Sequence, residues 1–190
     1  MSDVEVLKEG YFVKINYRGY EGRFFRVVDC EPFTYETGTG DEAEFTPVPP
    51  GSESGFKNIV ALEPDNRPMR LFYVLWGVKS GGRYKIKIPT GTDRLGTDVD
   101  KDVGFIDNVK SPYYAPNPKY AFWLIHDVYP SINFINTTPE TVTPKVWFTG
   151  FKYTLVEVSE PDVLEKLRNF ERGISPSIPF KLVTIGGVKE

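Results

Sequence analysis

The chain of 190 residues contains no glutamine, and it has one cysteine (Cys30), one histidine (His126) and two methionines. A single cysteine excludes an internal disulfide bond and any metal site built from several cysteines. Low contents of glutamine, cysteine and methionine, together with 16 prolines, are typical of proteins from thermophiles. We therefore expect a thermophilic source.

Long apolar runs and an excess of positive charge are missing as well. No apolar run approaches the roughly 18 residues that a membrane-spanning helix needs. The formal net charge is −3, so the chain lacks the basic field that attracts nucleic acids and anionic lipids. The first residues, MSDVEVLKEG, lack the apolar core of a secretory signal. We expect a protein without nucleic-acid or membrane partners, located in the cytoplasm during assembly or in a particle assembled there.

Alternating apolar and polar residues predict several β-strands. Residues 11–17 show this pattern, and the segment 22–29, which follows a short turn, is the expected partner in a β-hairpin. The stretch 69–78, MRLFYVLWGV, is almost wholly apolar and predicts a central strand buried on both faces. The glycine-rich residues 80–82 then predict a hairpin turn into the alternating strand 83–88.

The apolar segment 145–158 changes phase in its middle. Val146 and Phe148 lie on the apolar face before Gly150, whereas Tyr153 lies on the apolar face that follows it. A β-bulge near Gly150 would produce this shift by one residue.

One helix is predicted near the C-terminus. Ser159 is the expected N-cap, Pro161 lies in the first turn and Gly173 follows the last turn. The helix presents one apolar stripe, formed by Val163, Leu164, Leu167 and Phe170. A short strand at 180–184 is expected to follow it.

The proline-rich segment 111–118, SPYYAPNP, predicts an extended arm and not a central strand, because its prolines lack backbone donors. Tyr113 and Tyr114 on this arm are predicted to contact a neighbouring subunit, since aromatic side chains on a stiff segment lose little entropy on docking. The apolar run 120–129 predicts a core strand, and residues 131–136 are expected to turn back beside it.

These elements predict an all-β fold with one C-terminal helix. The expected architecture is a two-sheet β-sandwich, with a jelly roll as one form of it and a barrel as the alternative. We expect a single domain over residues 1–190. It carries long loops at 31–56 and 90–118, and a C-terminal helix plus strand within 159–190.

The residues offer little for catalysis. His126 lies in a predicted strand, where its neighbour Asp127 points to the opposite face and cannot form a relay with it. No GxSxG nucleophile motif accompanies this histidine. The sequence therefore predicts a protein that is not an enzyme. An unfamiliar enzyme that uses carboxylates alone is a more distant alternative.

Three alternating aspartates form the one candidate metal site. Asp98, Asp100 and Asp102 precede Gly104, and such spacing can place oxygen ligands around Ca²⁺. The segment departs from the EF-hand pattern, because Val109 stands where that pattern has glutamate. The alternative interpretation is a solvated acidic loop with no cofactor.

Two functional hypotheses follow. The first is a structural, non-enzymatic subunit of a large symmetric assembly that contacts copies of itself and other structural proteins. A capsid, decoration or tail protein in the virion of a virus or phage of a thermophile is the expected case. The second is a carbohydrate-binding β-sandwich module, with or without Ca²⁺, because exposed aromatic rings can stack on sugars. Asn136-Thr137-Thr138 also matches the sequon for N-glycosylation.

Overall fold

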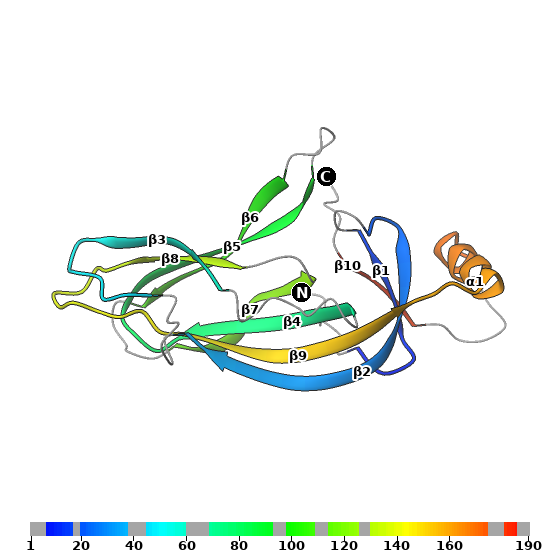
Figure 1. The fold of residues 1–190 in the computed structure, drawn as a ribbon, viewed down its shortest axis with the longest axis horizontal. Coiled ribbons are helices and arrows are strands. Elements are labelled where there is room, and N and C mark those ends of the chain that lie inside the picture. The colour runs from blue at the N-terminus through cyan, green and yellow to red at the C-terminus, as the bar shows by residue number, and fades with distance from the viewer. Residues whose placement is uncertain are drawn as a thin grey trace.

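The computed structural model describes residues 7–16, 20–37, 45–59, 69–92, 98–108, 114–125, 130–174 and 181–185; the side chains of 88–92, 98–108, 114, 117–120, 125 and 185 lie outside this description. Ten strands and one helix form within these residues (Figure 1). They are β1 (Phe12–Ile15), β2 (Arg23–Glu36), β3 (Glu53–Asn58), β4 (Met69–Val78), β5 (Gly82–Thr92), β6 (Asp98–Asn108), β7 (Tyr114–Ile125), β8 (Ser131–Ile135), β9 (Val146–Glu157), α1 (Pro161–Glu171) and β10 (Leu182–Ile185).

The strands form two sheets, which confirms the predicted all-β sandwich with one C-terminal helix. The long sheet has the strand order β10-β1-β2-β9-β4-β7, and the short sheet has the order β3-β8-β5-β6. This strand order does not establish a jelly roll. The pairing of β1 with β10 is parallel, unlike the antiparallel pairings around it. Within the described residues, no helix is long and apolar enough to cross a membrane.

The chain crosses between the sheets at two places where the sequence predicts hairpins. β4 belongs to the long sheet and β5 to the short sheet, although a glycine-containing turn joins them. In the same way, β7 pairs in the long sheet and β8 in the short one. Both predicted hairpins are therefore wrong, because a tight turn reverses the chain without deciding whether the next strand pairs or packs across. The predicted hairpin of β1 and β2 is confirmed.

The proline-rich segment forms part of an edge strand. β7 begins at Tyr114, contains Pro116 and Pro118, and lies at one edge of the long sheet. An edge strand tolerates proline because one of its two sides has no ladder to complete. The prediction of an extended segment outside the sheet centre is confirmed for residues 114–118.

Strands occupy parts of both predicted long loops, and those parts of the prediction are wrong. In 31–56, β2 continues to Glu36 and β3 begins at Glu53. In 90–118, β5 continues to Thr92, β6 takes 98–108 and β7 begins at Tyr114. The acidic composition of β6 misleads because this strand lies at an edge of the short sheet, where polar and charged residues are common.

The main core lies between the two sheets. From the long sheet, alternate residues of β4, β7 and β9 face this core, and from the short sheet alternate residues of β5 and β8 do so. Its largest fully buried members are Trp76, Tyr84, Phe134 and Phe148. Each strand thus contributes every second residue, as the alternation in the sequence requires.

A second core lies on the opposite face of the long sheet, near its β1 end. It contains Val13 of β1, Val27 of β2, Leu71 of β4 and Tyr153 of β9. The register of β2 with β9 shifts between Val27 and Asp29, which marks a bulge at Val28. A bulge bends its strand. Figure 1 shows that β2 curves along its length, and that β1 runs across the line of β4 and β9.

Strand β9 therefore changes the face on which it is buried, which explains the change of phase in its sequence. The predicted bulge at Gly150 is wrong, because β9 pairs with β2 and β4 through Gly150 without a shift of register. Val146 and Phe148 pack between the sheets, whereas Tyr153 and Leu155 pack in the second core. The apolar residues change side while the strand stays in register.

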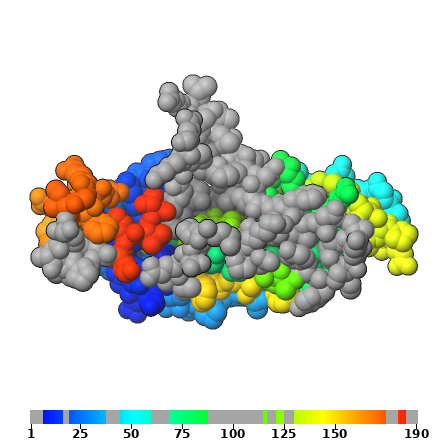
Figure 2. All heavy atoms as spheres, turned by 180° about the vertical axis from the view of Figure 1, so that it is seen from behind, coloured from blue at the N-terminus to red at the C-terminus, as the bar shows by residue number. Residues whose placement is uncertain are grey.

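Helix α1 and β10 cover the β1 end of the long sheet. Leu167 of α1 is fully buried against Phe12 and Phe24. The N-cap is Glu160 without a side-chain cap bond, so the predicted cap at Ser159 is wrong. Figures 1 and 2 show α1 at one end of the molecule and β3 with β8 at the other.

We expect Gly150→Ala to destabilise the fold strongly. A Cβ atom at Gly150 would lie 1.9 Å from the carbonyl oxygen of Tyr73, and the residue has φ of +152°. The expected loss is on the order of 3 kcal/mol or more, measured by denaturant unfolding. Gly51→Ala is the matched control: its φ is +74°, but nothing lies within 4 Å of the added atom, so its cost should stay near 1 kcal/mol. Equal losses for the two variants would show that close packing at Gly150 is unimportant.

Candidate functional site

A row of ring-bearing side chains crosses the long sheet on the face turned away from the short sheet. Pro32 of β2 lies opposite Phe151 of β9, Phe151 lies opposite Tyr73 of β4, and Tyr73 lies opposite Trp123 of β7. The Tyr73 and Trp123 ring centroids are 4.9 Å apart with planes at 45°. Pro32 is exposed and the three aromatic residues are half-buried. Adjacent strands thus build one contiguous strip of rings.

Three described positions beside this row on the same face are uncharged. Thr34, Thr149 and Leu75 form the next row in register, and Trp147 follows beyond Thr149. The Thr34 hydroxyl donates to the Phe148 carbonyl at 3.3 Å, so part of its polar capacity is already satisfied. We call this surface the outer aromatic face; it consists of Pro32, Thr34, Tyr73, Leu75, Trp123, Trp147, Thr149 and Phe151.

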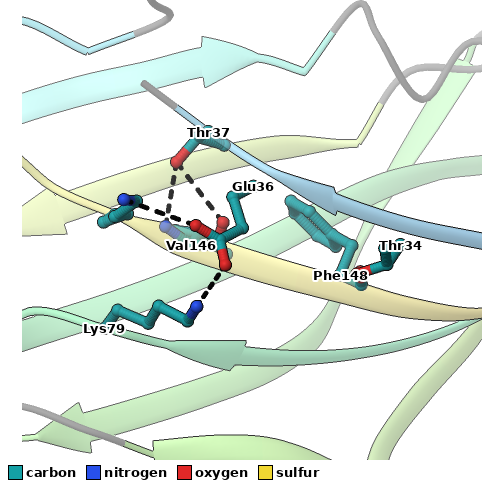
Figure 3. A network of polar contacts seen from close by, with 7 residues as sticks. Thr34, Glu36, Thr37, Lys79, Val146 and Phe148 are labelled. Atoms are coloured by element: carbon teal, nitrogen blue, oxygen red, sulfur yellow. Dashed lines mark hydrogen bonds and ion pairs between the residues drawn. The ribbon is translucent and has the colours of Figure 1, made fainter. Parts of the chain in front are cut away.

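An ion cluster closes one end of the outer aromatic face (Figure 3). The Glu36 carboxylate, at the end of β2, accepts from Lys79 after β4 and lies 3.3 Å from the Lys145 ammonium before β9. The Lys79 ammonium also lies 4.6 Å from the centroid of the Trp147 ring. Hydrogen bonding from Lys79, with help from Lys145, lowers the pKa of Glu36 below its ordinary value.

Backbone bonds hold the same strand ends together. The Thr37 N–H donates to the Val146 carbonyl at 3.0 Å, and the Val146 N–H donates to the Thr37 hydroxyl at 2.8 Å. Thr37 is fully buried. The ion cluster therefore lies on a fixed backbone junction of β2 and β9.

Away from the ion cluster, the tyrosine and cysteine side chains beside the rings stay neutral at neutral pH. Burial raises the pKa of Tyr73, and burial also raises the pKa of Tyr153 beneath the Trp123 ring. Burial, followed by the nearby Asp29 charge, raises the pKa of the Cys30 thiol. A protonated thiol is a poor nucleophile. The chemistry of this region is therefore apolar contact and ring stacking.

The structure describes the backbone of the three predicted metal ligands. Asp98, Asp100 and Asp102 lie in β6, opposite Thr92, Pro89 and Lys87 of β5, and not in a loop. A strand spaces alternate Cα atoms about 6.6 Å apart in a row, whereas a calcium loop curls around its ion. Among the residues whose side chains are described, no group of three or more His, Cys, Asp or Glu could hold a metal ion. The aspartate side chains lie outside that set, so the Ca²⁺ site stays a prediction.

The other predicted site residues are only partly described. Tyr114 begins β7, opposite Val78, with its side chain outside the description. Tyr113 and His126 lie outside the described residues. Their predicted roles, a subunit contact for both tyrosines and no catalysis for the histidine, stay predictions.

Asn136 of the sequon is a structural residue. It is fully buried, and its side-chain amide donates to the carbonyls of Val48 at 2.8 Å and Glu140 at 2.7 Å. Its side-chain oxygen accepts from the backbone N–H and the hydroxyl of Thr138. The folded chain thus uses the nitrogen to which a glycan would be attached.

Sequence reasoning found the aromatic richness but missed the outer aromatic face. Its members come from strands that are distant in sequence, and they meet only through the register of β2, β9, β4 and β7. One available signal was the half-polar alternation of 147–151, in which Trp147 and Phe151 fall on the side opposite Val146 and Phe148.

Comparison with known proteins does not place the chain in a family: no family model matches it, and no curated protein matches it in sequence.

We expect Asn136→Ala to lower the free energy of unfolding by about 2–3 kcal/mol, because the buried Val48 carbonyl, the part-buried Glu140 carbonyl and the Thr138 donors lose their partner. Thermal or denaturant unfolding measures the loss. Asn58→Ala is the control, since exposed Asn58 only accepts one bond from Ser131, at 2.6 Å. Its cost should stay below about 1 kcal/mol. A smaller loss for Asn136→Ala than for Asn58→Ala would contradict the structural role.

Proposed function

We propose that the protein is a structural, non-enzymatic subunit of a symmetric assembly, and that the outer aromatic face forms the centre of a contact between subunits. The observation that carries this proposal is the uncharged strip of Phe151, Tyr73 and Trp123 on adjacent strands. Aromatic residues are enriched, and charged residues depleted, in the cores of protein interfaces.

The size of the face supports a contact core more than a complete interface. Three strand spacings of about 4.8 Å and four residues of about 3.3 Å give roughly 14 Å by 13 Å. A stable interface buries about 800 Å² on each partner, several times this area. The face therefore has the dimensions of a cluster that carries most of the binding energy inside a larger contact.

The assembly that we propose is a virion. A virion, as capsid, decoration or tail protein of a virus or phage of a thermophile, agrees with a β-sandwich subunit and with the low glutamine, cysteine and methionine content. The partners are then copies of this chain and other structural proteins of the particle, which the subunit meets in the cytoplasm during assembly.

Carbohydrate binding is the second candidate function, and the same row of rings favours it. Tyr73, Trp123 and Phe151 offer ring surfaces on one face, as sugar-binding modules do. However, the Tyr73 and Trp123 planes are tilted by 45°, whereas a flat platform for one sugar chain needs near-coplanar rings. We therefore place this function second.

We expect Thr34→Lys to weaken self-association at least tenfold. Thr34 is exposed, so a lysine at this position should leave the fold of the subunit intact. In the contact between subunits, the ammonium group would have to lose its water, which costs binding free energy. Light scattering after size exclusion, over a range of concentrations, gives the association constant. Thr184→Lys adds the same charge at an exposed strand position beside β1 and should leave association unchanged.

Two results would count against this proposal. One is a wild-type protein that stays monomeric at every concentration and with the other particle proteins present. The other is equal association by wild type and Thr34→Lys. Binding of a glycan that Trp123→Ala abolishes in a folded monomer would favour the carbohydrate function.

A further inference from the structure

The ion cluster at the end of the outer aromatic face joins three strands through one carboxylate. Glu36 ends β2, Lys79 follows β4 and Lys145 precedes β9. The side chains of Glu36 and Lys79 are each 28% exposed and that of Lys145 is 42% exposed, so solvent weakens each pair taken singly. The important feature is the arrangement of the three groups and not the strength of either ion pair. A single carboxylate lies between two ammonium groups and compensates the charge of both.

Lys79 connects this carboxylate to the aromatic face. Its ammonium binds Glu36 and also lies over the Trp147 ring, 4.6 Å from the centroid (Figure 3 shows the Glu36–Lys79 contact). Its backbone N–H donates to the Lys145 carbonyl at 2.9 Å, and the Lys145 N–H donates to the Ser80 hydroxyl at 2.9 Å. The backbone of both lysines is thus fixed, and only their side chains are free to respond to a change of charge at Glu36.

We propose that Glu36, Lys79 and Lys145 form an acid-opening latch: protonation of Glu36 leaves two ammonium groups without their shared counter-ion, Lys79 moves away, and Trp147 loses its cation partner. Lys79 and Lys145 both lower the pKa of Glu36 and both lie within ion-pair distance of its carboxylate. On the short sheet, the hydroxyl of Tyr84 is bonded to Ser80, which in turn accepts from the Lys145 N–H. It remains protonated throughout the acid range.

The direction of the pH response follows from these contacts. Lys79 and Lys145 favour the charged carboxylate, so the pKa of Glu36 in the folded protein lies below the ordinary value of 4.5. The latch is therefore closed at neutral pH and opens only as the pH falls below that value. Its effect on subunit contacts rests on the proposed function, whereas the opening itself is a property of the single subunit.

Tryptophan fluorescence of the dilute protein, titrated from pH 7 to pH 3, tests the latch. The part of the signal that disappears in Trp147→Phe should change with a midpoint below 4.5, before far-UV circular dichroism shows any loss of strands. Glu36→Gln should give the acid-state signal already at pH 7 and show no transition. Lys79→Met, which removes the ammonium and keeps the stem, should also give the acid-state signal at pH 7.

Glu157→Gln is the matched control. Glu157 is a second carboxylate with a pKa lowered by a cation, here Arg23, and it lies at the other end of β9. This variant should keep the Trp147 transition. The latch is overturned if Glu36→Gln titrates like the wild type, if Trp147→Phe retains the transition, or if fluorescence and circular dichroism change together.

Association measured on the same variants separates the latch from the proposed function. If acid and Glu36→Gln both weaken association by a similar factor, the latch controls the contact. A wild type that never associates would remove the proposed function, and the fluorescence transition would still decide the latch.

Discussion

The close approach of β9 to β4 at Gly150 is the constraint on which the rest of the structure depends. β9 lies between β2 and β4, and its two halves bury opposite faces of the long sheet. Because Gly150 has no side chain, the carbonyl of Tyr73 can lie close to the backbone of β9 at the residue where β9 changes its buried face. Two cores can therefore share one continuous sheet, with the sandwich at one end and the curled β1 and β2 at the other.

This division also explains why the outer aromatic face is half-buried and not fully exposed. Tyr73, Trp123 and Phe151 lie where the second core ends, and they pack against its edge. The same rings thus stabilise the curled end and present surface beyond it. A side chain that serves both purposes is held in place before any partner arrives, which reduces the entropy lost on contact.

Alternation in the sequence predicted most strands, because a half-buried strand must alternate. The hairpin of β1 and β2 was recognisable from the alternation in 11–17, whereas the stretch 69–78 was recognisable because it is almost wholly apolar. Pairing between distant strands was not, since nothing local distinguishes a turn that continues a sheet from one that crosses to another. The turn after β4 and the bulge at Val28 show this limit, because each depends on what lies across the sheet.

The candidate site was less predictable than the fold for a related reason. The sequence favoured local clusters, such as Asp98 to Asp102 and Tyr113 with Tyr114, because neighbours in sequence are easily seen. The outer aromatic face and the Glu36 cluster each join residues from strands that are far apart in the chain. Their members are ordinary residues for their strands, and only the register of the long sheet brings them together.

The parallel pairing of β10 with β1 has a consequence for the order in which the molecule can be completed. β1 pairs on one side with β2, which follows it in the chain, whereas the partner of its other side, residues 182–185, is synthesised much later. Until the ribosome has released that segment, the long sheet carries an open row of backbone donors and acceptors at β1. A nascent chain stalled before β10 would expose this edge to other strands. Pairing with β10 therefore covers an edge of β1 that would otherwise be open to other strands.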